Sequence, residues 1–466
     1  MRKLIVTLAA ALLLAAPPTA GAAERAYELV SPVDKGGTDI GGVEQPYVSA
    51  NGEVGVYSAL SALPGADPVA NGAFNFYRSV RGPEGWSAKQ LGSPLGSVNN
   101  INVATYDIFS TDLMTGVQWG PATPSPVPGA TEGVLNLFLD DASGFRLITS
   151  GLTAEGSVQP LGGSDDLSRV VFTSFGPPLD PEALPAFRLL YEWDVAGEAP
   201  KIVGRLPDGS PSDEAVDLAT PPLVSEMEAD SFNPISADGS RIFFFTAAGA
   251  TSPELYVRID GAQTKRVSES QRAEPDPIEA GGPSFRVASD DGSVVYFSSR
   301  EKLTDDATTG PTDAGEDLYR FEVDSGELTD VTVDTVDPNG AEVEGVLGTS
   351  ADGSRVYFVA AGALAPGAVA GGNNLYLWTD DGSADGEITF IAPDASDVNW
   401  RPNFFGPLGE HVGGRVTPDG LHLLFHSSEG LTGNSTGGHL QVYLYDAESG
   451  DLRCVSCNPA GTPATA

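Results

Sequence analysis

The chain has 466 residues, with 25 basic and 64 acidic side chains and a formal net charge of -39 at pH 7. A surface of this sign repels phosphate backbones and anionic lipid, which excludes nucleic acid and bare membrane as natural partners. The length exceeds what one simple hydrophobic core organises, so the chain is either two domains or one array of repeats. Its 56 glycines and 36 prolines lie between short apolar runs, a distribution that favours many short strands over long helices.

The first residues have the features of a secretory signal peptide. The start, Met1–Lys3, is basic, an apolar run extends from Leu4 to Ala16, and small residues follow at Ala20 and Ala22. A transmembrane anchor is the alternative, but the apolar run is shorter than the roughly 20 residues that span a bilayer. We therefore expect residues 1–23 to be removed and the mature protein to be secreted or held outside the cytoplasm in the cell envelope, without a membrane span.

One sequence pattern recurs through the rest of the chain. A small residue and Asp-Gly are followed by alternating apolar residues, a loop and a pair such as Leu-Tyr. The Asp-Gly pair predicts a tight turn, because glycine accepts a positive φ and aspartate tolerates it. These aspartates are therefore interpreted as structural, and Leu-Tyr as core residues. The four clearest turns are at Asp238, Gly239, Asp291, Gly292, Asp352, Gly353, Asp419 and Gly420.

Weaker copies of the pattern begin at Ser49, Ser110 and Ser164, which makes seven units about 61 residues apart. Each unit predicts four antiparallel strands, and four strands repeated radially make a propeller, whose closed ring hides the sheet edges. We predict an all-β propeller with seven four-stranded blades over residues 45–460 and a tail at 461–466. An eight-bladed ring or a truncated array is the alternative.

The segment before the repeats, residues 24–44, is expected to contain one more strand. The residues Ala26–Val30 have the alternating character of a strand, which could pair with the last unit and close the ring. We treat this segment as a separate element from the repeat domain.

The repeat resembles a known family. Its Ser-x-Asp-Gly turn, apolar strand, Leu-Tyr pair and polar turn resemble the WD-like repeats of TolB-type propellers over about residues 45–457. Members of that family serve as envelope interaction modules, as propeller halves of peptidases and, in a few cases, as carbohydrate-active enzymes. The resemblance therefore implies a protein-binding role. Two departures from the family are the longer loops between second and third strands and the expectation of no second domain on either side.

The long loops are the expected working face of the molecule, because loops on a rigid scaffold are where recognition usually resides. The leading hypothesis is a non-catalytic binding scaffold, without a cofactor, for an envelope or extracellular protein or a glycan. A propeller whose catalytic partner domain lies on another chain is a further alternative. The loops concerned span about residues 246–254, 300–316, 360–373 and 427–440.

The four histidines are the best candidates for chemistry, because all of them fall in the last unit. Blade geometry could bring His411, His426 and His439 together, and imidazole is a good ligand for zinc, copper, iron or nickel. His422 is the poorer candidate, because four strand residues, or about 13 Å, separate it from His426. A metal-dependent lyase that acts on acidic oligosaccharides is therefore the enzymatic alternative. The sequence contains no Gly-x-Ser-x-Gly elbow and no phosphate loop.

The two cysteines, Cys454 and Cys457, are expected to pair as a small structural disulfide, since an exported protein meets an oxidising environment. Residues three apart in a regular strand point to opposite faces, so this pairing requires a turn at Val455 and Ser456. A free pair of thiols is the alternative.

An acidic loop in the fifth unit is a candidate for a calcium ion. It contains Thr304, Asp305, Asp306 and Asp313 and ends at Asp317, so it is rich in oxygen ligands. The spacing is not that of an EF-hand, and a solvated acidic loop is the alternative interpretation.

Overall fold

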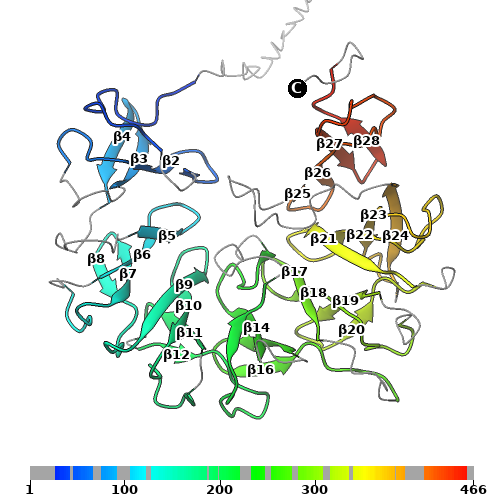
Figure 1. Ribbon diagram of the computed structural model, residues 1–466, viewed down its shortest axis with the longest axis horizontal. Helices are drawn as coiled ribbons and strands as arrows, with labels where there is room; N and C mark the ends of the chain where they lie inside the picture. Colours follow the sequence, from blue (N-terminus) through cyan, green and yellow to red (C-terminus); the bar gives the residue numbers. More distant parts are fainter. Residues whose placement is uncertain are drawn as a thin grey trace, which may run out of the picture.

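The structure is a computed structural model. It describes residues 27–41, 46–66, 75–91, 105–121, 127–185, 188–197, 199–220, 232–246, 253–274, 282–307, 315–334, 340–383, 385–393 and 414–458. These residues form seven four-stranded antiparallel sheets that follow one another around a centre (Figure 1). Each sheet consists of four strands that are consecutive in the chain. The predicted all-β propeller with seven four-stranded blades is therefore confirmed.

Every blade uses one continuous stretch of chain. The first three blades contain β1 (Tyr47–Val48), β2 (Val54–Ala59), β3 (Asn75–Gly82), β4 (Gly85–Gln90); β5 (Thr105–Phe109), β6 (Gly116–Pro121), β7 (Leu135–Asp141), β8 (Gly144–Leu147); β9 (Ser157–Gly163), β10 (Arg169–Phe175), β11 (Leu189–Asp194) and β12 (Lys201–Ile202). The fourth and fifth contain β13 (Val216–Leu218), β14 (Arg241–Thr246), β15 (Glu254–Ile259), β16 (Gln263–Arg266); β17 (Ser284–Ala288), β18 (Val294–Ser299), β19 (Asp317–Glu322) and β20 (Leu328–Asp330). The last two contain β21 (Val343–Thr349), β22 (Arg355–Ala360), β23 (Asn374–Thr379), β24 (Glu387–Ala392); β25 (Gly414–Val416), β26 (His422–Ser427), β27 (Gln441–Asp446) and β28 (Asp451–Cys454).

The first strand of a blade lies toward the centre and the fourth toward the outside (Figure 1). Because the strands are antiparallel, the turn between the first and second strands (the 1–2 turn) and the 3–4 turn lie on one face of the propeller. The loop between the second and third strands (the 2–3 loop) lies on the opposite face. All seven blades have the same order, so the seven 2–3 loops share one face.

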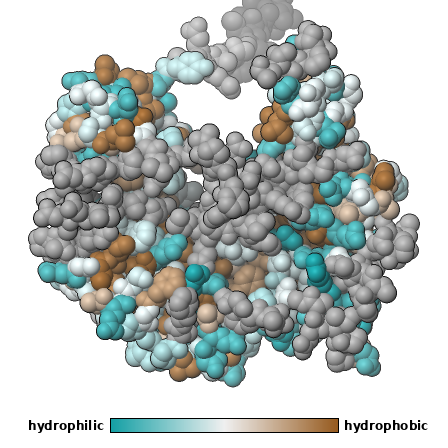
Figure 2. Space-filling model, in the orientation of Figure 1, coloured by the Kyte–Doolittle hydropathy of each residue, from teal (hydrophilic) through white to brown (hydrophobic). Residues whose placement is uncertain are grey.

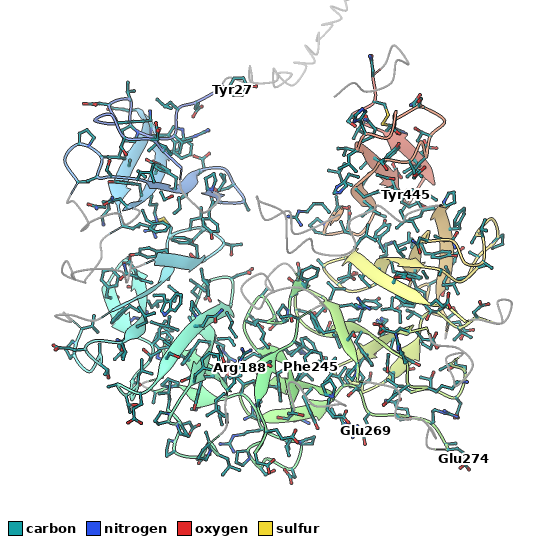
Figure 3. The ribbon with its side chains drawn as sticks, viewed as in Figure 1. Tyr27, Arg188, Phe245, Glu269, Glu274 and Tyr445 are labelled. Carbon is teal, nitrogen blue, oxygen red and sulfur yellow. A yellow bond between two sulfur atoms is a disulfide. The ribbon has the colours of Figure 1, made fainter. Side chains whose placement is uncertain are left out.

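A stacked aromatic pair recurs in the core of six blades. The second strand supplies one ring, and the third supplies the tyrosine of the Leu-Tyr pair, with ring centroids 5.4 to 5.9 Å apart. Contacts between blades are also aromatic: Tyr445 of the last blade meets Tyr357 of the sixth edge-on at 6.3 Å (Figure 3). The core is therefore a series of apolar layers between neighbouring blades.

The Asp-Gly pairs form the 1–2 turns. In the sixth blade, Asp352 Oδ1 accepts hydrogen bonds from the Ser350 hydroxyl at 2.6 Å and from the Ser354 amide at 2.9 Å. The glycines Gly239, Gly292, Gly353 and Gly420 have φ between 65° and 69°, where a side chain would be strained. Equivalent pairs of hydrogen bonds are accepted by Asn51, Asp112, Asp166, Asp238, Asp291 and Asp419.

Backbone hydrogen bonds join the 1–2 turns of the second to sixth blades, each to the turn of the next blade. In each of these bonds, the backbone amide of the second residue of one turn donates to the carbonyl of the equivalent residue in the next blade, at 2.7 to 2.9 Å. The residues joined in this way are, in order, Thr111, Asp165, Ala237, Asp290, Ala351 and Pro418. Pro418 accepts the last of these bonds but has no N–H group to donate, so the series cannot continue from the last blade to the first.

The first and last blades face each other across an opening in the arc of sheets (Figures 1 and 2). Residues 27–41 lie on the first blade, where Val30 packs near Tyr57 and Ile40 bridges to Ala59. Residues 27–30 lie outside any strand, in contrast to the expectation for this segment, and the Trp86 side chain donates a hydrogen bond to Glu28 there. Ring closure by residues 24–44 stays a prediction.

Both ends of the chain carry predictions that lie outside the described residues. These are the signal peptide at 1–23 and the tail at 461–466. Among the residues that the structure describes, no helix has the length and apolar character needed to cross a membrane.

Candidate functional site

In five blades, the hydroxyl of the third-strand tyrosine forms a hydrogen bond with the backbone of the 2–3 loop. Its hydroxyl accepts a hydrogen bond from the loop backbone in four blades and donates one to the Glu429 carbonyl in the last blade, at 2.6 Å. The four accepted bonds, of 2.8 to 3.3 Å, are Leu63 to Tyr77, Leu179 to Tyr191, Leu303 to Tyr319 and Leu364 to Tyr376. The Leu-Tyr pattern predicts these tyrosines only as core residues, and no local signal in the sequence indicates that their hydroxyls also hold the loops.

The loop of the sixth blade, residues 361–373, is held by a second side chain as well. The amide of Asn374 donates to the carbonyl oxygens of Val369 at 3.0 Å and Gly372 at 2.7 Å, and its oxygen accepts from the Val369 amide at 3.1 Å. The Val369 side chain between these bonds is 59% exposed. This loop therefore presents an apolar side chain from a backbone that is fixed by hydrogen bonds.

Exposed aliphatic side chains recur on this face. They come from the 2–3 loops of four different blades and are 42% to 59% exposed: Leu60, Leu184, Val369 and Leu440. Each of these side chains belongs to a separate blade, and single exposed apolar side chains are common on protein surfaces. Figure 2 shows hydrophobic patches from several blades between hydrophilic ones, on the face that it views.

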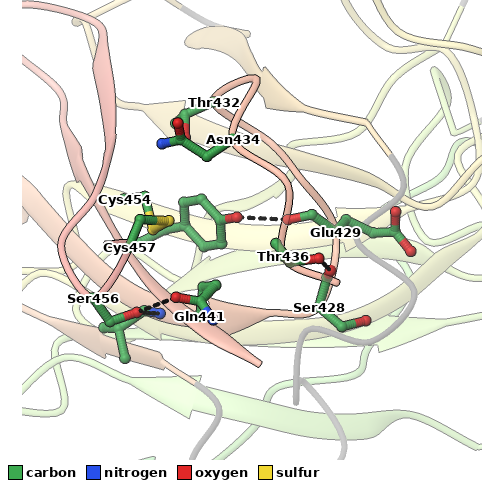
Figure 4. The surroundings of a disulfide bond; sticks show 11 residues. Ser428, Glu429, Thr432, Asn434, Thr436, Gln441, Cys454, Ser456 and Cys457 are labelled. Carbon is green, nitrogen blue, oxygen red and sulfur yellow. Dashed lines mark hydrogen bonds between the residues drawn. A yellow bond between two sulfur atoms is a disulfide. The ribbon is translucent and has the colours of Figure 1, made fainter. Parts of the chain in front are cut away.

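The loop of the last blade, residues 428–440, is closed by the Thr436 hydroxyl, which donates to the Ser428 carbonyl (Figure 4). The same figure shows the tyrosine ring of β27 with its hydroxyl on Glu429. His439 lies near the end of this loop with an exposed side chain, and its backbone amide donates to Thr436.

The predicted histidine site is incomplete in the structure. His411 lies outside the described residues, His426 is half-buried on β26, and His439 is in the exposed loop. His422, the poorer candidate, lies with its Nε2 3.7 Å from the Asp446 carboxylate. Within the described ranges, no three His, Cys, Asp or Glu side chains are grouped closely enough to hold a metal ion. A metal site of His411, His426 and His439 therefore stays a prediction.

Cys454 and Cys457 are joined by a disulfide, with their Cα atoms 5.5 Å apart (Figure 4). The chain bends at residues 455–457, where the expected turn lies. The Ser456 hydroxyl donates to Gln441 at 3.0 Å and accepts the Val442 amide at 2.8 Å. This arrangement ties the end of the last strand to β27.

The acidic loop of the fifth blade divides into two parts. The exposed Asp305 accepts the Ala273 amide at 3.2 Å, whereas Asp317 is buried on β19. Asp313 lies outside the described residues. The acidic side chains of this loop are therefore in different environments, and they are not all solvated.

A cleft of about 1090 Å³ lies between the first and second blades, and its lining includes Arg78, Lys89 and Asp140. Tyr106 donates its hydroxyl to Asp140 at 2.7 Å, and burial raises the pKa of that carboxyl group. Burial lowers the pKa of Arg78, whose Nε and Nη2 have no hydrogen-bond partner. The cleft thus combines a half-buried cation with a carboxyl group. No motif indicates it, because these residues come from separate blades.

The seven four-stranded blades make this chain a β-propeller. No protein-family model and no curated protein matches the sequence. Among solved structures, the chain is similar to TolB from Acinetobacter baumannii, with 12% identity, a TM-score of 0.30, and coverage of 82% of this chain and 76% of that one. It is also similar to the β-propeller domain of the Trilobed protease from Pyrococcus furiosus, with 12% identity, a TM-score of 0.34, and coverage of 91% and 99%.

A third similar structure is that of prolyl endopeptidases, with 12% identity and a TM-score of 0.42. The match covers 90% of this chain and 49% of that chain, so this protein spans about half the length of that enzyme. These proteins include TolB and peptidase propellers, the kinds of propeller that the repeat resembles. At such low identity, the likeness concerns the fold alone.

Proposed function

We propose that this chain is an exported, non-catalytic scaffold that binds an envelope or extracellular protein on the face formed by its 2–3 loops. The observation that supports this proposal is the fastening of the loops by tyrosine hydroxyls in five blades. A loop that is already ordered loses less conformational entropy on binding, so more of its contact energy contributes to affinity.

The exposed aliphatic side chains of four loops support a protein as the partner, because they can fill apolar pockets on a second protein surface. The net charge of -39 favours a partner that is neutral or basic where it meets this face. Export is supported by the sequence of residues 1–23. The metal-dependent lyase stays an alternative with no observation in its favour, since His411 is outside the described residues.

The register of the blades permits a clean loop deletion. Ala360 pairs directly with Asn374, so replacement of residues 361–373 by Asn-Gly would leave a two-residue hairpin. Ser427 pairs with Gln441 in the same way, and residues 428–440 can be replaced likewise. A matched control is available on the opposite face of the sixth blade, where Thr379 pairs with Glu387 and residues 380–386 can be replaced by the same two residues.

The experiment is chemical cross-linking of the tagged mature protein in the envelope fraction of its own cells, followed by mass spectrometry. We expect one protein to be captured by the wild type and by the 380–386 variant, and to be lost from both loop variants. Capture that survives both loop deletions would show that this face is wrong. Binding of purified glycans by the wild type, with no protein captured, would replace the protein partner with a carbohydrate.

A further inference from the structure

The first blade has two cations at paired positions of its third and fourth strands. The residue after the third-strand tyrosine is Arg78, and its partner on β4 is Lys89, so the two side chains share one face of the blade. Like charges directly opposite each other destabilise a sheet. The other five blades with this tyrosine avoid two cations here, since their pairs are Glu192–Lys201, Val257–Lys265, Arg320–Thr329, Leu377–Thr389 and Leu444–Arg453.

This face lines the cleft between the first and second blades, where the two blades are parted. The hydrogen bonds between successive 1–2 turns begin at Thr111, and among the described residues no backbone bond joins it to Ala50, the equivalent residue of the first blade. A second cavity of about 500 Å³ lies between these two turns, and it shares Thr115 with the cleft. The cleft therefore lies on the face of the 1–2 and 3–4 turns, opposite the 2–3 loops.

The donors of Arg78 are positioned for an acceptor that this chain does not supply. Its side chain is half-buried, and Nε and Nη2 are buried without a hydrogen bond to any described residue. These two nitrogens lie on the same edge of the guanidinium plane, and such an edge binds both oxygens of a carboxylate or phosphate. Lys89 is exposed across the strand pair from Arg78, so it can add a second positive charge to the same ligand.

The second blade adds acidic groups to the cleft, and these limit the charge of the ligand. Asp140 accepts the Tyr106 hydroxyl at 2.7 Å. Burial raises the pKa of Asp140, and the charges of Arg78 and Lys89 act against this rise, which places both cations near the carboxyl group. Asp141 is paired with Arg146 at 2.6 Å. With Asp140 so close, a ligand with one negative charge is repelled less than a phosphate with nearly two.

Apolar side chains complete the lining, and they include Leu91, Met114 and Phe145. Met114 is 44% exposed in the free protein. A cavity of about 1090 Å³ with apolar walls and a few polar groups at one side is typical of a site for a small organic molecule.

We propose that this cleft binds an organic carboxylate with an apolar body, and that Arg78 and Lys89 hold its carboxylate group. The two oxygens would accept hydrogen bonds from Arg78 Nε and Nη2, and the body would cover the apolar lining. Binding at this site does not depend on the 2–3 loops, which lie on the opposite face. The cleft and the loop face can therefore succeed or fail separately.

The test uses the mature protein and N-acetyl-L-phenylalanine as the probe, at concentrations up to about 10 mM. Ligand-observed NMR gives the dissociation constant, with N-acetyl-L-phenylalaninamide as the uncharged comparison and inorganic phosphate as the competitor. We expect the acid to bind, and the amide and phosphate to bind at least about tenfold more weakly.

Four variants show whether the guanidinium holds the ligand. We expect Arg78→Gln and Arg78→Lys each to weaken binding by about tenfold or more, because lysine keeps the charge but lacks the paired donors. Lys89→Gln should weaken binding by about threefold. The control is Arg81→Gln on the same strand, which removes the same charge from a residue that pairs with Glu28 and lies outside the cleft lining.

Thermal unfolding without ligand shows which variants fold, and the exposed Lys89 keeps the test open if the Arg78 variants do not. No binding of the acid at about 10 mM, or equal binding of the acid and the amide, would overturn the proposal. Phosphate that binds as tightly as the acid would overturn the choice of a carboxylate. An equal loss in Arg81→Gln would show attraction by overall charge, and would overturn the assignment to this cleft.

Discussion

Gly353 lies so close to the fifth blade that a Cβ atom built on it would come 2.7 Å from the Cβ of Val294. The sequence pattern accounts for a glycine at this position, because the Asp-Gly turn requires a positive φ here. The structure adds that the turn packs directly against the preceding blade. The same holds for Gly239 and Gly420, where an added Cβ would meet Arg169 and Arg355. Glycine is thus required both by the turn and by the contact between blades.

Substitution of Gly353 by alanine should therefore lower the free energy of unfolding much more than the same change in a turn that contacts no other blade. Gly382 is the matched control, because its φ is +81° and nothing lies within 4 Å of an added Cβ. We expect Gly382→Ala to lower the free energy of unfolding by about 1 kcal/mol and Gly353→Ala by about 3 kcal/mol, from strain and overpacking together. Denaturant unfolding measures both, and equal losses would contradict the close contact.

The tyrosine hydroxyls can be tested by the removal of one oxygen atom. Tyr376→Phe leaves the ring in place but removes two hydrogen bonds of the hydroxyl. One is accepted from the Leu364 amide at 3.2 Å, and the other is donated to the Gly362 carbonyl at 2.7 Å. We expect a loss of about 1 to 2 kcal/mol in the free energy of unfolding. Hydrogen exchange at Leu364 should become faster, because the loop is no longer fastened there.

The control for this substitution is Tyr445→Phe. The Tyr445 ring packs against Tyr357, but its hydroxyl forms no hydrogen bond with the residues that the structure describes. We expect a change below about 0.5 kcal/mol and no effect on exchange in residues 361–373. If both variants lose the same stability, the effect comes from the ring environment and the loops are not held by the hydroxyl.

The turn aspartates should make the fold sensitive to acid. Burial raises the pKa of Asp352, but hydrogen bonds from Ser350 and Ser354 outweigh it, so the pKa lies below the ordinary value of 3.8. The same net lowering applies to Asp238 and Asp291. A carboxyl group with a lowered pKa in the folded state stabilises the fold above its unfolded pKa. That stabilisation is lost as the pH falls through the folded pKa.

The triple variant Asp238→Asn, Asp291→Asn, Asp352→Asn tests this linkage. Asn51 in the first blade accepts the same two hydrogen bonds, from Ser49 and Glu53, so asparagine can form the turn. We expect the variant to fold at pH 7 and to lose less melting temperature than the wild type between about pH 5 and pH 3. Identical pH profiles would show that these carboxylates do not contribute to acid unfolding.

The disulfide should contribute only modestly to stability. Cys454 and Cys457 are three residues apart, and a short closed loop restricts the unfolded chain little. We expect Cys454→Ser, Cys457→Ser to lower the free energy of unfolding by about 2 kcal/mol or less. The intact mass of the untreated wild type should be lower by two hydrogens than after reduction, and an unchanged mass would show free thiols.

The repeat and the number of blades could be predicted from the sequence, because both depend on local signals. Alternation predicts a strand such as β14, and Asp-Gly predicts the turn before it. The candidate sites depend on relations that no local signal carries. Arg78 and Lys89 share a face only through the register of β3 with β4. Arg78 and Asp140 meet only because two blades are neighbours.

The last blade offers a test of whether the arc closes in solution. Leu424 occupies the position on β26 that Val171 occupies on β10, the position that faces the next blade. Val171 is fully buried, whereas Leu424 is 40% exposed, and an added Cβ on Gly52 of the first blade would meet nothing within 4 Å. We therefore expect Leu424→Ala to cost less than about 1 kcal/mol and Val171→Ala about 2 kcal/mol or more.

The outcome also decides what residues 24–44 do. A low cost for Leu424→Ala means that this face is open to solvent and that Pro418 is the end of the inter-blade series. A cost equal to that of Val171→Ala means that something covers Leu424 in the free protein. If removal of residues 24–44 then brought the cost back down, the covering element would be the predicted closing strand. If it did not, the first blade itself would have to close on the last.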